Sequence, residues 1–295
     1  TLHGGVFDVP QAEREELLKP VANRPEWGQA VGALLGSRRV LEDADHVICV
    51  GYGEFEKASE HLGHDRVSYL PNGVDTAKFA TGDGGGFRRK HRIPPDALLV
   101  LNVSRIDAQK NQLLLLEAFL EVRRERPDAV LMLMGPETQP AYASRLRQFI
   151  ADHHLEAGVR MLPGLRNDDP DLVNAYHACD VFVLPSVHEP FGIVVLEAWA
   201  AGRPVIANHV GGLRGLVRHG ENGLFIREEG GGTAAELADR IVSLARSPGR
   251  RCELGEAGRK AATSTYDWSG VVTRLEGIYQ AAEAHAARRG NGRPS

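Results

Sequence analysis

Two glutamates stand out in HEPFGIVVLEAWAAG, residues 188–202. Glu189 lies in a polar turn, and Glu197, eight positions later, interrupts an otherwise apolar run. A two-carboxylate hydrolase needs its pair about 5–9.5 Å apart across one bond. Eight residues of helix would rise about 12 Å. Part of the span is loop, because the helix is predicted to begin near Gly192, yet we interpret the pair as too far apart to serve one atom. The spacing instead suits the two ends of an elongated polyhydroxylated ligand, because charged carboxylates are strong acceptors for hydroxyl groups.

Each glutamate also has a structural interpretation. Apolar residues surround Glu197, and a buried carboxylate is unfavourable unless a partner compensates it. Glu197 would then lie on a narrow solvent-facing stripe or pair with a structural arginine. Glu189 would be a carboxylate favoured by the dipole at a helix N-terminus. Position favours a ligand, because DVFVLPS is a predicted strand and VHEPFG is the loop at its carboxyl end, where open parallel sheets bind ligands.

A second candidate segment is VLNVSRIDAQKN, residues 100–111. A strand ends there, and Arg105 and Lys110 flank a short loop before a helix that begins at Asn111. Two cations beside a helix N-terminus suit a diphosphate, although ordinary solvated loop charge is the alternative. The strand exits LMGPE (133–137) and MLPGLR (161–166) each hold a glycine that lets the backbone approach a ligand. LPGLR could offer main-chain groups to a nucleobase.

Short apolar runs bounded by turn residues predict the strands that position these segments. The runs are 46–50, 66–70, 97–103, 129–134, 159–162, 180–184, 204–207 and 223–226. Helical patterns lie between most of them, for example at 111–126, 141–153, 169–179 and 192–201. Strands that alternate with helices predict an α/β fold whose parallel sheet is covered on both faces.

The chain is predicted to form two lobes. Residues 71–96 concentrate glycines, prolines and charges, which is typical of a linker. Residues 233–287 are predicted to be entirely helical, and the tail 288–295 is expected to be disordered. The last helix carries an apolar stripe made of Trp268, Val271 or Val272, Leu275, and Ile278 or Tyr279.

The composition disfavours several classes of function. The chain has 295 residues, of which 42% are hydrophobic and 25% charged, as in a soluble globular protein. A net charge of −4 does not favour nucleic acid or an anionic membrane as partner. No apolar stretch approaches the roughly 20 residues of a membrane helix. The three cysteines form no CxxC motif and no even disulfide set. We therefore expect a cytoplasmic protein without a transmembrane segment, either free or peripheral to a membrane.

Longer motifs resemble a known family. SRIDAQKN, LPGLRNDDPDLVNAYHACDVFVLPSVHEPFGIVVLEAWAAGRPVIANHVGG and ENGLF, in this order, resemble the retaining glycosyltransferases of family 4. LPNGVD is similar to the family's segment before the interlobe linker, and YDWSGVVTRLEGIY to its closing helix. The resemblance implies a GT-B fold of two Rossmann-like lobes. It places the remainder of the N-terminal acceptor lobe at 1–75, the donor lobe at 76–265 and the closing helix, which crosses back to the first lobe, at 266–287.

The resemblance also implies a set of site residues. The implied catalytic residues are Arg105, Lys110, Glu189 and His3. The implied donor-binding residues are Ser104, Gly135, Gly164, Arg166, Pro190, Phe191, Gly192, Ile193 and Glu197.

In the implied roles, Glu189 holds hydroxyls of the donor sugar and Glu197 holds those of the ribose. Arg105 and Lys110 neutralise the diphosphate leaving group, and the main chain near Arg166 meets the base. Backbone N–H groups at the start of the helix after HEPFG meet sugar hydroxyls and phosphate. His3, in TLHGG, is similar to a first-lobe histidine that contacts the transferred sugar.

The reaction implied by the resemblance is sugar transfer with retention at the anomeric carbon, from a sugar nucleotide to a hydroxyl of a small molecule, a lipid-linked acceptor or a glycan. No side-chain nucleophile takes part, and an oxygen of the leaving diphosphate deprotonates the incoming hydroxyl. Positioning and electrostatic stabilisation then supply the catalysis. No cofactor and no metal are expected. NDDPD (167–171) resembles a metal-binding cluster, but we interpret its acids as the first turn of the helix that holds Leu172 and Tyr176.

One departure from the family affects the prediction. The family's glycine-rich loop near the start of the first lobe has no counterpart before His3, so we expect an N-terminally truncated first lobe that lacks much of the acceptor site. TLHGG then represents the end of a buried strand. The alternatives are a non-catalytic nucleotide-sugar-binding module, or another GT-B enzyme such as a sugar-nucleotide epimerase or a phosphorylase.

Overall fold

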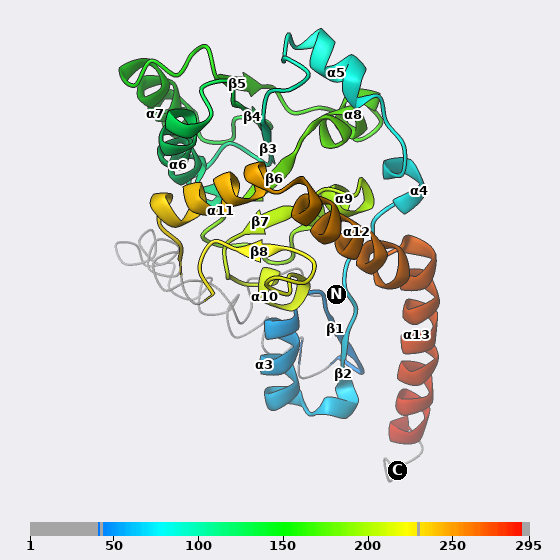
Figure 1. Ribbon diagram of the computed structural model, residues 1–295. Helices are drawn as coiled ribbons and strands as arrows, with labels where there is room; N and C mark the ends of the chain where they lie inside the picture. The colour runs from blue at the N-terminus through cyan, green and yellow to red at the C-terminus, as the bar shows by residue number, and fades with distance from the viewer. Residues whose placement is uncertain (1–40, 42–43, 229–230, 291–295) are drawn as a thin grey trace, which may run out of the picture. The chain divides into compact units, whose positions relative to one another are not determined.

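The computed structural model describes residues 41, 44–228 and 231–290, with side chains as far as residue 283. The chain divides into two compact units (Figure 1). Unit 1 consists of two segments of the chain, one that ends at Asn72 and one that begins at Ser269. Unit 2 is Gly73–Trp268. Parallel sheets occur in both units, so the predicted α/β fold is confirmed.

Unit 1 contains a strand–helix–strand arrangement. Its elements are β1 (Val47–Cys49), α3 (Tyr52–Leu62), the 3₁₀ helix η1 (His64–Arg66), β2 (Val67–Tyr69) and α13 (Trp268–Gly290). The two strands are parallel, and parallel strands need a crossover connection, which α3 supplies. Cys49, Ala58 and Val67 form a buried cluster between this helix and the strands.

In the C-terminal helix α13, Val271 rather than Val272, and Ile278 rather than Tyr279, belong to the packed apolar stripe. Val271, Leu275 and Ile278 pack together with Ile48 and Leu70 of unit 1. The exposed members of the stripe are Trp268, Val272 and Tyr279. The helix runs to Gly290, past its predicted end at 287, and residues 291–295 of the predicted tail lie outside the described residues.

Unit 2 is built on a parallel sheet that has six strands in the described residues. The strands are β3 (Leu99–Val103), β4 (Val130–Met134), β5 (Val159–Leu162), β6 (Val181–Leu184), β7 (Val205–Ala207) and β8 (Leu224–Phe225). The helices are α4 (Thr76–Phe79), α5 (Gly84–Lys90), the 3₁₀ helix η2 (Ala108–Lys110), α6 (Gln112–Glu125), α7 (Pro140–Asp152), α8 (Pro170–Ala178), α9 (Ile193–Ala200), α10 (Leu213–Leu216), α11 (Ala234–Arg246) and α12 (Pro248–Thr265). The strand order is β5-β4-β3-β6-β7-β8, which is the doubly wound order.

Helices cover both faces of this sheet, as the continuous apolar runs predict. Successive side chains of a strand point to opposite faces. Leu99 and Leu101 therefore pack in one buried layer with residues of α5, α8 and α9. Val100, between them, packs in a second layer with residues of α6, α7 and α11. Figure 1 shows the two groups of helices on opposite sides of the strands.

The prediction of a linker at 71–96 was wrong, because this segment belongs to unit 2 from Gly73 onward. It forms α4 and α5, and the carboxylates of Asp75 and Asp83 accept hydrogen bonds from backbone N–H groups of their first turns. Phe79 and Phe87 are almost completely buried in the core of unit 2. Two caps and two buried aromatic rings outweigh the glycine-rich composition on which the prediction rested.

The chain enters and leaves unit 2 at the same place. Val74 donates a backbone hydrogen bond to Tyr266 O at 2.8 Å, and Trp268 donates one to Val74 O at 3.2 Å. The side chains of Thr76 and Asp267 are also hydrogen-bonded. These contacts fix the two ends of unit 2 beside each other.

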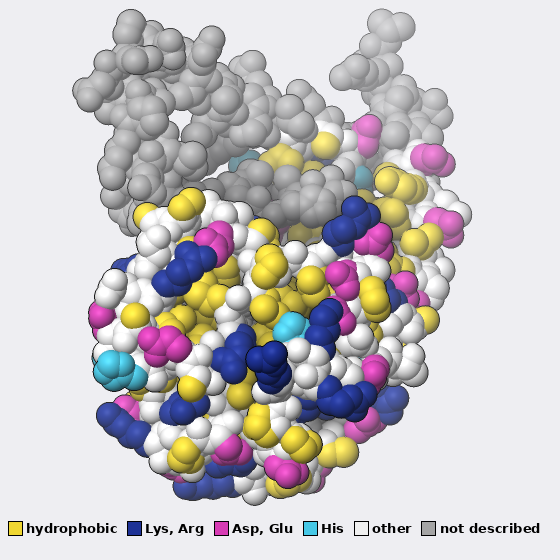
Figure 2. Space-filling view, turned by 90° about the horizontal axis from the view of Figure 1, so that it is seen from above, with side chains coloured by type: hydrophobic (Ala, Val, Ile, Leu, Met, Phe, Trp, Pro, Cys, Tyr) yellow, Lys and Arg dark blue, Asp and Glu magenta, His cyan; other side chains and the backbone are white. Residues whose placement is uncertain are grey.

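The surface seen in Figure 2 carries charges of both signs. Lys and Arg side chains are interspersed there with acidic and hydrophobic ones. Within the described part of the chain, no helix combines the length and the apolar character needed to cross a bilayer.

Candidate functional site

The candidate site lies where the strand order of the larger sheet reverses. β3 and β6 are neighbours, and the chain winds away from them in opposite directions. The loop 104–111 follows β3 and the loop 185–192 follows β6, so both lie at the carboxyl edge of the sheet. Open α/β sheets bind ligands at this kind of switch point. The two segments singled out in the sequence therefore meet.

An ion pair joins the two loops. Lys110 Nζ lies 2.7 Å from Glu189 Oε2, and the side chains are only 12% and 9% exposed. Ser186 Oγ donates to the same carboxylate oxygen at 3.3 Å. The family resemblance implies that Lys110 binds a diphosphate and Glu189 a sugar, and it does not imply a contact between the two side chains. Glu189 Oε1 makes no hydrogen bond to the described residues, so it can accept one from a ligand.

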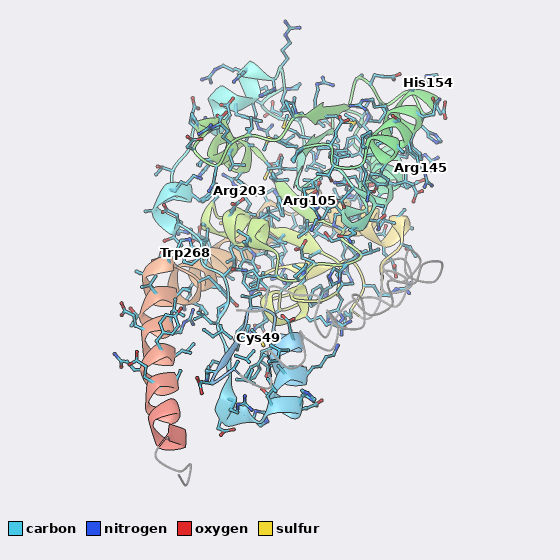
Figure 3. All side chains as sticks on the ribbon, turned by 180° about the vertical axis from the view of Figure 1, so that it is seen from behind. Cys49, Arg105, Arg145, His154, Arg203 and Trp268 are labelled. Atoms are coloured by element: carbon cyan, nitrogen blue, oxygen red, sulfur yellow. The ribbon has the colours of Figure 1, made fainter. Side chains whose placement is uncertain are left out.

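Arg105 is the more accessible of the two predicted cations (labelled in Figure 3). Its side chain is 53% exposed, and Nη2 lies 3.3 Å from Asp107 Oδ2. Asp107 is buried and also accepts a hydrogen bond from the backbone N–H of Lys110 at 3.2 Å. The aspartate therefore fixes the loop that carries both cations and leaves much of the Arg105 guanidinium open to a ligand.

The loop that carries Glu189 is held from two sides. Val187 donates a backbone hydrogen bond to Gln109 O, and Gly212 donates one to Glu189 O, both at 2.8 Å. Gly211 has φ +47°, and a Cβ there would lie 2.2 Å from Glu189 O. Only glycine permits this approach, so the loop after β7 can pack directly on the backbone of Glu189.

The start of α9 presents backbone donors to the same edge. Gly192 is the N-cap residue with φ +99°, and no side chain of the described residues caps the helix. The Val195 N–H donates to Gly192 O at 2.9 Å, whereas the N–H groups of Ile193 and Val194 have no partner among the described residues and are available to an anion. Phe191 is buried in the core, Pro190 is half-buried, and the Ile193 side chain is exposed. The predicted donor-binding segment therefore combines a fixed backbone with open donors.

Glu197 has a partner that neither structural interpretation included. Tyr176 Oη donates to Glu197 Oε2 at 2.6 Å, and the tyrosine is completely buried. Burial raises the pKa of the Glu197 carboxyl above that of an ordinary glutamate, and the hydrogen bond from Tyr176 lowers it in part. Burial also raises the pKa of the Tyr176 hydroxyl well above its ordinary value. The tyrosine therefore acts as donor and the glutamate as acceptor.

Sequence reasoning missed Tyr176 and Lys78 as site residues. The Lys78 ammonium donates to the backbone and side-chain oxygens of Asn167, and its charge lowers the pKa of Glu197. Tyr176 looked like an ordinary core residue because it lies in an apolar helical pattern. Lys78 gave no signal, since it lies in the segment interpreted as a linker.

The predicted glycines at the strand exits bring loops together. A Cβ on Gly135 would lie 1.7 Å from Ser104 O, and a Cβ on Gly164 would lie 2.6 Å from Pro136 Cδ. The Ser104 hydroxyl donates to Asn102 Oδ1 at 2.8 Å. The loops after β3, β4 and β5 are thus in contact, and a direct role of these residues in donor binding stays a prediction.

The acids of NDDPD are engaged in local structure. Asp169 caps α8 and Asp171 lies in its first turn, as the helix interpretation predicts. Asp171 also pairs with Lys90. Asp168 pairs with Arg166 at 2.9 Å, and the Arg166 side chain is 86% exposed. Among the described residues, no group of three or more His, Cys, Asp or Glu is arranged to hold a metal ion. His3 and the TLHGG segment lie outside the described residues.

Comparison with known proteins agrees with this fold. The family described as glycosyl transferases group 1 matches residues 86–261, which is more than half of the chain. A D-inositol 3-phosphate glycosyltransferase of Pseudarthrobacter chlorophenolicus is 33% identical over 256 residues, which cover 85% of this chain and 59% of that protein. A D-inositol 3-phosphate glycosyltransferase of Kineococcus radiotolerans is 31% identical, and the match covers 96% of this chain and 69% of that protein. The chain therefore belongs to the group 1 glycosyltransferases.

Solved structures support the same fold. HepE of Anabaena, solved in complex with UDP and glucose, has a TM-score of 0.72 at 25% identity, over 80% of this chain and 63% of HepE. Sucrose-phosphate synthase of Thermosynechococcus elongatus has a TM-score of 0.71 at 27% identity, over 89% and 63% of the two chains. The predicted GT-B class of fold is confirmed. The chain spans about three fifths of the length of the first of these relatives.

Proposed function

We propose that this chain binds a nucleoside diphosphate sugar at the carboxyl edge of the larger sheet and transfers the sugar, with retention and without a divalent metal, to a hydroxyl acceptor. One observation carries the proposal: the Lys110–Glu189 ion pair joins the loops after β3 and β6 at the switch point of the sheet. It places a cation and a carboxylate beside the open N–H groups of α9. This is the combination that a diphosphate linked to a sugar requires.

Each end of the donor has a proposed partner. Arg105, Lys110 and the first N–H groups of α9 bind the diphosphate. Glu189 Oε1 accepts a hydrogen bond from the sugar. Glu197, the fifth residue of α9, accepts hydrogen bonds from the ribose.

The proposed reaction breaks the bond between the anomeric carbon and the diphosphate oxygen and forms a bond to the acceptor oxygen. The acceptor proton passes to the departing diphosphate. Negative charge grows on the diphosphate during this step, so Arg105 and Lys110 stabilise the transition state more than the ground state. Since the relatives are named for D-inositol 3-phosphate and HepE was solved with UDP, UDP-sugars and an inositol phosphate are the first donor and acceptor to try.

The test is calorimetric titration of the 295-residue chain with UDP-, GDP- and ADP-sugars in excess EDTA. One sugar nucleotide should bind, with an affinity that added Mg²⁺ or Mn²⁺ does not change. Incubation with the acceptor should then give a product whose anomeric configuration, read by NMR, matches the donor. Failure of every sugar nucleotide to bind would refute the proposal. Binding without transfer or donor hydrolysis would favour a non-catalytic module, and a strict metal requirement would refute the role given to the two cations.

A further inference from the structure

A cavity of about 430 Å³ lies at the edge of the larger sheet opposite to the donor site. Asp180 and Pro204 line it, and they directly precede β6 and β7, so the cavity is at the amino ends of these strands. The turn 200–204 after α9, the exposed face of the first turns of α12 and the ends of α4 and α8 complete the lining. All of these residues belong to unit 2.

Positive charge dominates the lining. The lining contains three arginines, Arg203, Arg251 and Arg259, and two acidic residues, Asp180 and Glu256. Glu256 is paired with Arg259. The remaining lining charges are therefore two guanidinium groups and one carboxylate.

A residue outside the cavity already neutralises that carboxylate. Asp180 Oδ2 accepts hydrogen bonds from Arg88 Nη2 and from the backbone N–H of Leu99, both at 2.8 Å. Arg251 Nη2 lies 3.9 Å from Asp180 Oδ1, which is too far for a hydrogen bond. Arg203 and Arg251 thus retain an excess positive charge in the cavity.

The Arg203 guanidinium also has an unused buried donor. Its Nη1 donates to Cys179 O at 3.2 Å, whereas its Nε is buried and has no hydrogen-bond partner among the described residues. A buried N–H without an acceptor is unfavourable, and the more so on a charged group. Figure 3 shows Arg203 near α8 and α9, where the cavity lies. Arg203 Nη2 makes no hydrogen bond to the described residues, so this group is the donor that remains for an acceptor in the cavity.

Arg251 is held rigidly beside it. Its Nη1 donates to Leu244 O at 2.7 Å and to Ala245 O at 3.0 Å. A guanidinium that is already ordered loses little entropy when it binds an anion. The cavity volume is within the range of small-molecule sites and is much larger than a single ion needs.

We propose that this cavity binds a small phosphate-bearing molecule, and that Arg203 and Arg251 are its cations. A phosphate monoester carries a charge of about −1.5 to −2 at neutral pH and offers three acceptor oxygens, which matches two guanidinium groups with free donors. The site is separate from the proposed donor site, because the two lie at opposite edges of one sheet.

The chain contains its own reporter for this cavity. Of its three cysteines, Cys252 is exposed and lines the cavity, whereas Cys49 and Cys179 are buried. Burial raises the pKa of each buried thiol to about 12, so neither forms the reactive thiolate readily. Alkylation by uncharged iodoacetamide, followed by mass spectrometry, therefore measures access to the cavity at Cys252.

The experiment uses glucose 6-phosphate and inorganic phosphate as probes, and glucose as the neutral control. Both phosphates should slow the alkylation of Cys252 in a saturable way, and glucose should not. Arg203→Gln should weaken the protection about tenfold or more, since it removes a charged hydrogen-bond donor. Arg105→Gln, at the proposed donor site, should leave it unchanged.

A second pair of variants avoids any loss of structure at Arg203. Cys252 is exposed, so Cys252→Asp and Cys252→Ser should both fold. Calorimetry with glucose 6-phosphate should show binding to the serine variant and its loss in the aspartate variant, because the new carboxylate repels the phosphate. Absence of saturable protection, equal protection by glucose, equal loss in Arg105→Gln or equal binding by the two Cys252 variants would each overturn the proposal. These results do not depend on whether a sugar nucleotide binds.

Discussion

Lys110 and Glu189 are 79 positions apart in the sequence, yet Nζ of one lies 2.7 Å from Oε2 of the other. They belong to loops that follow β3 and β6, and both side chains are almost buried. The contact joins the cation predicted for the phosphate to the carboxylate predicted for the sugar. The same pair therefore contributes to folding and to the candidate site.

The first prediction concerns the stability that this ion pair contributes. Lys110→Met should lower the free energy of unfolding by about 3–5 kcal/mol, because it leaves the Glu189 carboxylate buried without a cation. Lys110→Met with Glu189→Gln should recover part of that loss, since the uncompensated charge is gone. Chemical denaturation measures both. Arg124→Met, which breaks an exposed pair with Glu121, is the control and should change stability by less than about 1 kcal/mol. Equal effects of Lys110→Met and Arg124→Met would mean that the buried pair has no special role.

The second prediction separates the two glutamates by ligand. Glu197→Gln should weaken the binding of UDP and of the full sugar nucleotide equally, by about 1.5–3 kcal/mol, because the ribose is present in both. Glu189→Gln should not weaken the binding of UDP, because it removes the carboxylate that competes with the diphosphate for Lys110. It should weaken the binding of the sugar nucleotide and reduce transfer steeply, since the anomeric carbon is no longer held in line. Paired titrations of each variant with the two ligands give the answer. If both variants lose both ligands to the same extent, the division of roles is wrong.

The third prediction follows from the raised pKa of Glu197. A carboxyl whose pKa is raised in the folded state contributes stability that is fully present below its unfolded pKa and is lost as pH rises through the folded pKa. As pH rises from the unfolded to the folded pKa of Glu197, the stability of the wild type should therefore decline relative to that of Glu197→Gln, which has no group to titrate at this position. Chemical denaturation at a series of pH values from about 4 to about 8 measures the difference. A difference that does not vary with pH would show that the carboxyl is not desolvated.

The same pKa should affect binding in the opposite sense. The ribose contact needs the carboxylate, so UDP affinity should fall as pH decreases through the raised pKa of Glu197, before an ordinary glutamate protonates. Tyr176→Phe removes the hydrogen bond that partly lowers this pKa. The fall should then begin at a higher pH. An unchanged profile in this variant would show that Tyr176 does not tune Glu197.

The fourth prediction tests the backbone at the start of α9. Gly192 has φ +99°, and an added Cβ would lie 2.7 Å from Leu213 Cδ2. Gly192→Ala should therefore lower the free energy of unfolding by about 1–3 kcal/mol and weaken binding of the sugar nucleotide, since strain displaces the N–H groups. Gly249→Ala, in the first turn of α12 with open space at its Cβ, is the matched control. It should leave stability unchanged or raise it slightly, by up to about 1 kcal/mol. Comparable losses in the two variants would argue against a strained backbone at Gly192.

Local patterns were enough to predict most elements of the fold. Apolar runs at 97–103 and 180–184 predicted β3 and β6, because a strand buried on both faces must be apolar along its whole length. The segment 71–96 was wrongly predicted to be a linker, because the prediction rested on its glycine-rich composition and did not take account of Phe79 and Phe87, which are buried. A composition average does not report how a few large side chains pack.

The residue types of the site, and the sheet edge to which they belong, were determined by the sequence alone. Arg105, Lys110 and Glu189 each lie in a loop that follows a predicted strand, and parallel strands bring the ends of those strands to one edge. Which of them touch was decided by the tertiary structure. The pairing of Lys110 with Glu189 requires β3 to lie beside β6, and the pairing of Tyr176 with Glu197 requires α8 to pack near α9. Strand order and helix packing follow from the burial of the whole core, which no local run of residues encodes.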